Sequence, residues 1–208
     1  SALRRPRGRV AATAGIALYP GGDWSTWSAD PAIGDSLTVT GEITEYNGLL
    51  EIGPNLTAVV FEGAGTVPEP LVIGAADMDE SLEGQLVRVN GVTFPLAGQE
   101  ITGNNTYDFT ADGQTGVIYV RTSNSLVGET LTGCAVDLLG IVSQFSFDGF
   151  GGYQLLPRGP VDLIPAAGIC YTSPVVQSDM TTSSFTLSWT TDLAAEGMVE
   201  FGLTEALG

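Results

Sequence analysis

The chain has 208 residues, enough for one to three domains, and its 28 Gly and 11 Pro predict short strands joined by turns. Its net charge of −17 disfavours contact with a phosphate backbone unless a local basic patch or bound cations offset it. Two cysteines are too few for a disulfide-rich mini-protein. No run of about 18 apolar residues is present, so no membrane span is predicted.

The first nine residues carry four of the seven arginines, Arg4, Arg5, Arg7 and Arg9. We interpret this stretch as a solvated tail. The alternative is an arm that binds an acidic surface, such as a neighbouring copy of the chain. No signal peptide is predicted, because the arginines are not followed by an adequate apolar region.

Two blocks of sequence occur twice. "TAGIALYPGG" (13–22) matches "TGVIYVRTSN" (115–124), and "GDSLTVTGEITEYNGLLEIGP" (34–54) matches "GCAVDLLGIVSQFSFDGFGGYQLLPRGP" (133–160). The glycines of the first block are offset by 101 residues and those of the second block by 99. A nearly constant offset across two predicted strands indicates a duplicated domain.

The first copy reads as a bent hairpin. Apolar and polar residues alternate in "SLTVTGEITEY", which predicts a half-buried strand, and Gly41 predicts a bulge or bend within it. Asn47-Gly48 is the preferred dipeptide of a two-residue turn between antiparallel strands.

The second copy contains five predicted strands, at about 85–94, 105–111, 115–122, 134–145 and 152–157. A short helical pattern over 75–84 precedes them, with Asp77 as its expected cap. Five strands that bend at glycines favour the OB-fold, a five-stranded Greek-key barrel. The predicted fold class is therefore all-β.

A resemblance to a known family supports this interpretation. "SLEGQLVRVNGVTF", "TGVIYVR" and "GYQLLPRGPVDL" resemble the OB-fold domains of large secreted bacterial proteins, over about 71–165 and more weakly over 13–61. Such domains accompany extracellular nucleases and phosphoesterases and also occur in multidomain surface proteins. The resemblance implies an extracellular or cell-surface location, and it implies the fold more firmly than a function.

The last forty residues resemble the start of a fibronectin type III-like sandwich. "SFTLSWTTD" (184–192) and "GMVEFGLT" (197–204) match its second and third strands, whereas a complete sandwich needs about seven. We predict three domains: the end of a first OB-fold-like barrel (1–68), a complete second one (69–165) and the beginning of the sandwich (166–208).

The first barrel lacks equivalents of the first two strands of the second barrel. Three explanations remain: the chain is a fragment, its arginine-rich start is not native, or another chain supplies the missing strands by β-strand complementation. In the last case, head-to-tail contacts that do not close would produce filaments.

The candidate chemistry is sparse. The absence of histidine removes His-dependent triads and His-based metal sites. The acidic segment 77–83 could attract Ca²⁺, but a solvated turn is the favoured interpretation. No catalytic residue, metal or cofactor is predicted, and the chain is not expected to be an enzyme.

The candidate binding residues are aromatic and basic. An OB-fold stacks bases on aromatic side chains of its second and third strands. The candidates on these strands are Tyr107, Phe109, Tyr119 and Arg121. Trp24 and Trp27 are further candidates in the first copy. Cys134 and Cys170 could form one disulfide, although their positions favour two separate buried thiols.

The function expected from these patterns is a non-catalytic extracellular binding or structural module, and one form of it is a bacterial surface protein that self-assembles into filaments. Its expected partners are neighbouring copies or other domains of a longer chain, with a polysaccharide or protein ligand. The alternative is a nucleic-acid-binding accessory region of a secreted nuclease or phosphoesterase, which the acidic charge disfavours.

Overall fold

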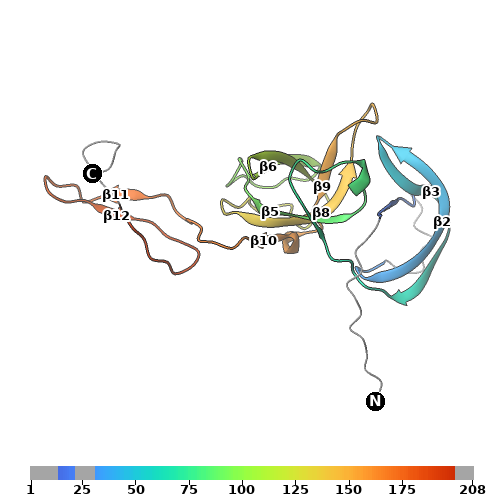
Figure 1. The fold of residues 1–208 in the computed structure, drawn as a ribbon, viewed down its shortest axis with the longest axis horizontal. Coiled ribbons are helices and arrows are strands. Elements are labelled where there is room, and N and C mark those ends of the chain that lie inside the picture. The colour runs from blue at the N-terminus through green and yellow to red at the C-terminus, as the bar shows by residue number, and fades with distance from the viewer. Residues whose placement is uncertain (1–13, 22–30, 200–208) are drawn as a thin grey trace, which may run out of the picture. The chain divides into compact units, whose positions relative to one another are not determined.

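The computed structural model describes residues 14–21 and 31–199, and it confirms that the chain is all-β. The chain divides into two compact units, Ser1–Ala166 and Ala167–Gly208, coloured from blue to orange and from orange to red in Figure 1. The first unit holds both sheets that correspond to the two sequence copies, so the expected division at residue 68 stays a prediction.

A three-stranded sheet comes first, in the order β1-β3-β2. Its strands are β1 (Ala17–Leu18), β2 (Asp35–Tyr46) and β3 (Leu49–Ala64). β2 and β3 form the long curved hairpin of Figure 1, closed by Asn47-Gly48 with φ of 51° and 92°. The register shifts on both sides of Gly41, which confirms the irregularity predicted there.

A seven-stranded sheet follows, in the order β4-β5-β8-β9-β7-β6 with β10 beside β8. Its elements are β4 (Leu71–Ile73), the 3₁₀ turn η2 (Glu80–Leu82), β5 (Leu86–Val92), β6 (Asn105–Ala111), β7 (Gln114–Val120), β8 (Val136–Gln144), β9 (Tyr153–Leu156), the 3₁₀ turn η3 (Pro160–Asp162) and β10 (Leu163–Pro165). A single bridge joins Thr93, after β5, to Thr110 of β6. The sheet is therefore not a continuously hydrogen-bonded barrel.

Both sheets use the same pairing. β1 runs parallel to β3 while β2 runs antiparallel to it, and β7 runs parallel to β9 while β8 runs antiparallel to it. Leu18 lies opposite Ile52 in the first sheet, and Ile118 lies opposite Leu155 in the second.

The hydrophobic core belongs to the second sheet. Its fully buried side chains alternate along the strands and include Val87, Phe109, Ile118, Leu138 and Leu155. This alternation produces one inward face per strand. The first sheet buries little among its described residues, and large apolar side chains on it are exposed, including Ile43 and Tyr46.

Some local predictions need correction. The cap of the 3₁₀ turn is Asp79, which accepts hydrogen bonds from the backbone N–H and hydroxyl of Ser81, and not Asp77. Asp77 instead accepts from the N–H of Gly74, because the helical turn begins two residues later than the pattern suggested. Cys134 and Cys170 are half-buried and disulfide-bonded, so the favoured expectation of two separate buried thiols is not met.

The second unit contains a two-stranded ribbon, β11 (Val176–Ser178) with β12 (Thr186–Ser188). No described residue of this unit is buried. Within 184–192 only the three residues of β12 are strand, and residues 197–199 are not strand. The remainder of the expected third strand lies outside the described residues.

Candidate functional site

A pocket of about 680 Å³ lies in the first unit, on the outer face of the second sheet. Three aromatic rings line it, those of Tyr46, Tyr119 and Phe145, together with the cation Arg121. Its polar lining consists of Asn104, Thr106, Thr122, Ser123, Ser143, Gln144 and Gln154. We call this site the aromatic pocket.

β7 positions two of the predicted residues in this pocket. Ile118 and Val120 point into the core and are fully buried, so Tyr119 and Arg121 lie on the opposite face. The hydroxyl of Tyr119 donates a hydrogen bond to Asn104 Oδ1 at 3.2 Å. The predicted pairing of Tyr119 with Arg121 on one face therefore matches their positions in the structure.

Tyr107 and Phe109 were expected on the same binding face, and this placement is wrong. Both are buried, with 1% and 0% of their surface exposed. Residues directly opposite in paired strands share a face, and Tyr107 lies opposite Ile118 while Phe109 lies opposite Gly116. The Phe109 ring covers Gly116, where a Cβ atom would collide with it. These two aromatic residues are core.

The hairpin tip of the first sheet forms one wall of the pocket. Its Asn47 carbonyl accepts a hydrogen bond from the N–H of Ser146 at 2.7 Å, and its Leu50 N–H donates to Glu83 Oε1 at 3.0 Å. Gly48 lies against the side chain of Gln144, where a Cβ would collide. The tip thereby brings Tyr46 within 6.5 Å of Phe145, measured between ring centroids.

The loop after β8 forms the neighbouring wall. Gln144 is almost fully buried, and its Nε2 donates to the carbonyl of Gly151 at 2.8 Å, which ties the loop to the sheet. Phe145 packs edge-on against Phe147, with 5.3 Å between centroids. The sequence reasoning missed Tyr46, Gln144 and Phe145. Their places beside the two aligned hairpin turns were the signal that could have found them.

Arg121 carries the charge of the pocket. It is exposed and forms no ion pair with any residue that the structure describes. Arg121 acts electrostatically on Glu51 of β3, which is 8% exposed. Burial raises the pKa of the Glu51 carboxyl, and the positive charge of Arg121 partly offsets this rise.

The pKa of Glu51 leads to a prediction about stability. The pKa of the Glu51 carboxyl is higher in the folded chain than in the unfolded chain, so the protonated carboxyl favours folding. As the pH rises from the unfolded pKa through the folded pKa, the carboxyl loses its proton and destabilises the folded chain. We expect Glu51→Gln to raise the free energy of unfolding at about pH 7, and to change it little at about pH 4, below the raised pKa. Urea denaturation at both pH values measures this. An equal gain at both values would contradict the assignment.

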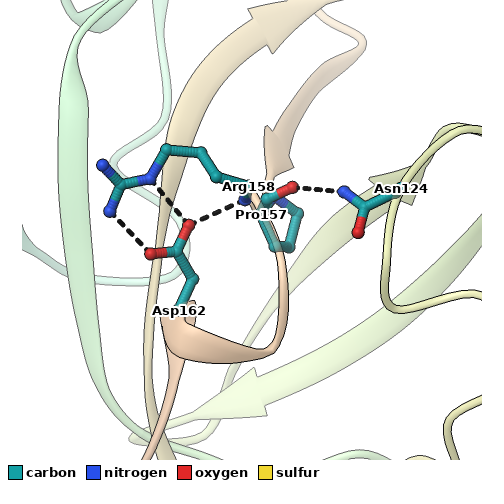
Figure 2. Close-up of polar contacts among 4 residues, drawn as sticks. All are labelled: Asn124, Pro157, Arg158 and Asp162. Carbon is teal, nitrogen blue, oxygen red and sulfur yellow. Dashed lines mark hydrogen bonds and ion pairs between the residues drawn. The ribbon is translucent and has the colours of Figure 1, made fainter. Parts of the chain in front are cut away.

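The chain that leaves β9 is held by a buried carboxylate (Figure 2). Asp162 Oδ2 accepts hydrogen bonds from the backbone N–H and Nε of Arg158 at 2.7 and 2.9 Å, and Oδ1 accepts from Nη2 at 2.6 Å. Asn124 Nδ2 donates to the carbonyl of Pro157 at 2.7 Å. These bonds fix the backbone beside Leu156, which lines the aromatic pocket.

Trp24 and Trp27 lie outside the described residues. Among the residues that are described, no group of three acidic or cysteine side chains is arranged to hold a metal ion. Within the same part of the chain, no helix has the length and apolar character needed to cross a membrane.

Comparisons with known proteins give a distant and partial similarity. No protein-family model matches it, and no solved structure matches it. It is similar to the endonuclease YhcR of Bacillus subtilis strain 168, with 27% identity over 139 residues. The match covers 62% of this chain and 11% of the endonuclease.

This similarity contradicts the prediction that the chain is not an enzyme. The prediction relied in part on the absence of histidine, which removes only His-dependent mechanisms. The matched region is a small part of the endonuclease, so the activity of that whole protein is not assigned to this chain.

Proposed function

We propose that the first unit binds single-stranded nucleic acid in the aromatic pocket, as part of an extracellular protein that acts on nucleic acid. The observation that carries the proposal is the lining of this pocket. Three rings offer stacking surfaces, amide and hydroxyl groups offer hydrogen bonds, and Arg121 offers a positive charge that has no ion pair among the described residues. Stacking of bases on aromatic side chains contributes about 1–3 kcal/mol per base and tolerates any sequence.

The position of the pocket on the sheet supports the same proposal. We assign β5 to β9 to the five strands of an OB-fold, whose second and third strands and adjoining loops bind oligonucleotides or oligosaccharides. The pocket uses Thr106 of β6, Tyr119 of β7, Asn104 from the loop before β6 and Phe145 from the loop after β8. The similarity to an endonuclease favours the nucleic acid over the sugar.

The oxidised cysteines support the extracellular part of the proposal. Disulfides persist in secreted and cell-surface proteins and are rare in the reducing cytosol. Both Cys134 and Cys170 are disulfide-bonded.

Replacing Arg121 tests the proposal directly. We expect Arg121→Gln to weaken binding of a labelled thymidine oligonucleotide about tenfold, because a charge-assisted contact to phosphate is lost. The slope of log affinity against log salt should become shallower by about 0.7, the value for one phosphate contact on a single strand. Fluorescence anisotropy over a salt series measures both quantities.

Arg121→Lys is the matched control. Lysine keeps the charge but loses the planar fork of donors, so the salt slope should stay while the affinity falls in part. If neither variant changes affinity or slope, or if no oligonucleotide binds at low salt, the proposed function is wrong. Binding of a neutral oligosaccharide that is indifferent to salt would identify the other ligand class of this fold.

Self-association is a second candidate, and one observation favours it. β2 is an edge strand of its sheet, with no partner on its outer side among the described residues, and Ile43 on it is 65% exposed. Long edge strands with exposed apolar side chains pair readily with other chains. Size-exclusion chromatography with light scattering tests this candidate. A monomer at high concentration would remove it, and the nucleic-acid proposal would be unaffected.

A further inference from the structure

We propose that the bound strand does not end at the aromatic pocket but continues along a cleft between the two sheets of the first unit. In this arrangement the three-stranded sheet and its flanking loops supply one side of the binding surface. This inference rests on the proposed function and specifies which residues the ligand follows.

Three pockets lie in series within this unit. The aromatic pocket shares Leu49, Arg121, Ser143 and Leu156 with a middle pocket of about 300 Å³. The middle pocket shares Gly84, Ile141 and Arg158 with a far pocket of about 440 Å³. The first and the last share no lining residue, so the three follow one another as one path, which we call the cleft. A linear polymer fits such a path better than a compact small molecule does.

Both sheets line the cleft along its length. The three-stranded sheet and its flanking loops supply Leu49 to the first two pockets, and Ser36, Thr66 and Val67 to the far pocket. The second sheet supplies Ile141, which lines the middle and the far pocket. A strand bound in the cleft would therefore touch both sheets at once.

Two of the three arginines in the described part of the chain line the cleft. The chain carries a net charge of −17, yet the charged residues that line the cleft are Arg121, Arg158 and Asp35. Arg158 is paired with Asp162, as the third described arginine, Arg88, is paired with Asp137, so Arg121 is the arginine that has no ion pair among the described residues. The charge of Arg121 and the N–H groups of Arg158 that Asp162 does not bind give an anionic ligand two contact points in an otherwise acidic protein.

The two arginines lie where the pockets join. Arg121 lines both the aromatic and the middle pocket, and Arg158 lines both the middle and the far pocket. Asp162 holds Arg158 through Nε and Nη2, which leaves Nη1 without a described partner. Successive phosphates of a single strand would meet one arginine and then the other. Proteins that bind single strands usually combine a positively charged groove, which follows the phosphate backbone, with aromatic side chains on which the bases stack.

A charge placed at the far end of the cleft tests this path. Thr66 lies in the exposed loop after β3 and makes no described side-chain hydrogen bond, so its variants should fold. We expect Thr66→Glu to weaken binding of a thymidine dodecanucleotide about three- to fivefold and Thr66→Lys to strengthen it by a similar factor. A thymidine tetranucleotide has about the length of the smallest binding sites, which is about 4 nucleotides. It should bind more weakly than the dodecanucleotide, and neither Thr66 variant should change its affinity.

Gln99 provides the matched control pair. It is exposed, lies in the same unit and lines none of the three pockets. Gln99→Glu and Gln99→Lys change the net charge as the Thr66 variants do, and we expect neither oligonucleotide to respond. Anisotropy titrations at low salt measure all four variants.

The outcomes separate this inference from the proposed function. If both oligonucleotides bind and the Thr66 variants affect neither, the cleft is not the path, while the aromatic pocket stands. An equal response of the two lengths, or an equal response to the Gln99 variants, would show a general charge effect and also overturn the path. If neither oligonucleotide binds the wild-type protein, the proposed function itself fails.

Discussion

Phe109→Ala is expected to lower the free energy of unfolding by about 3–5 kcal/mol while leaving the affinity for oligonucleotides unchanged. The ring has no exposed surface and packs over Gly116 inside the second sheet, so its removal leaves a cavity that the neighbouring strands cannot fill. Urea denaturation followed by circular dichroism measures the loss. Anisotropy at low temperature, where the variant stays folded, measures the affinity.

Phe150→Ala is the matched control for this variant. The Phe150 ring is 83% exposed, so the same substitution should change the free energy of unfolding by less than about 0.5 kcal/mol. The experiment also tests whether the Phe109 ring lies in the core or on the binding face. A variant that keeps its stability but loses oligonucleotide binding would restore the ring to the binding face and contradict its burial.

Asp162→Ala is expected to lower the free energy of unfolding by about 3 kcal/mol. The carboxylate is 1% exposed and accepts three hydrogen bonds from Arg158, one from its backbone and two from its guanidinium. Removing the acceptor leaves a half-buried cation without a partner, which is more unfavourable than the loss of a neutral hydrogen bond. Urea denaturation measures the change.

A double-variant cycle separates the ion pair from the backbone contact. Asp162→Asn keeps an acceptor for the Arg158 N–H but loses the charge, and Arg158→Met removes the cation while keeping a similar apolar volume. We expect the double variant Arg158→Met/Asp162→Asn to be more stable than Asp162→Asn alone, by about 1 kcal/mol or more. Additive effects would show that the side-chain pair contributes nothing.

The strands of the second sheet could be predicted from the sequence because the pattern that indicates a strand lies within a few consecutive residues. Alternation of apolar and polar residues depends on neighbours two positions apart, and β6 was predicted with its observed bounds. The turn at Asn47-Gly48 was predictable for the same reason, since a two-residue turn with positive φ demands these residues. Gly41 carried its own signal as a glycine within a strand.

The face of each strand in the site was only partly predictable. Spacing shows that Tyr107 shares a face with Phe109, and that Tyr119 shares a face with Arg121. It does not show which of the two faces is buried. The register of the β6–β7 hairpin decides this, because it places Tyr107 opposite the buried Ile118. Counting outward from the turn at Asp112-Gly113 would have revealed that the two pairs lie on opposite faces.

The contact between the two walls of the pocket could not be predicted, for a different reason. It brings together the β2–β3 tip and the loop after β8, about a hundred positions apart in the sequence. Contacts such as Ser146 with Asn47 depend on how two sheets pack, and no local pattern encodes that. In the second unit, the strand expected over 184–192 is shortened to β12, because the exposed ribbon there has no buried face to define a period.

The hairpin tip also has a consequence for how related chains could differ. β2 and β3 are paired up to Tyr46 and Leu49, so an insertion of two residues in each strand would advance the tip by about 7 Å. An even number of residues keeps the same side chains on the same face, whereas an odd number reverses them. Ligand size would then vary with hairpin length among such chains, even if every residue on the second sheet stayed the same.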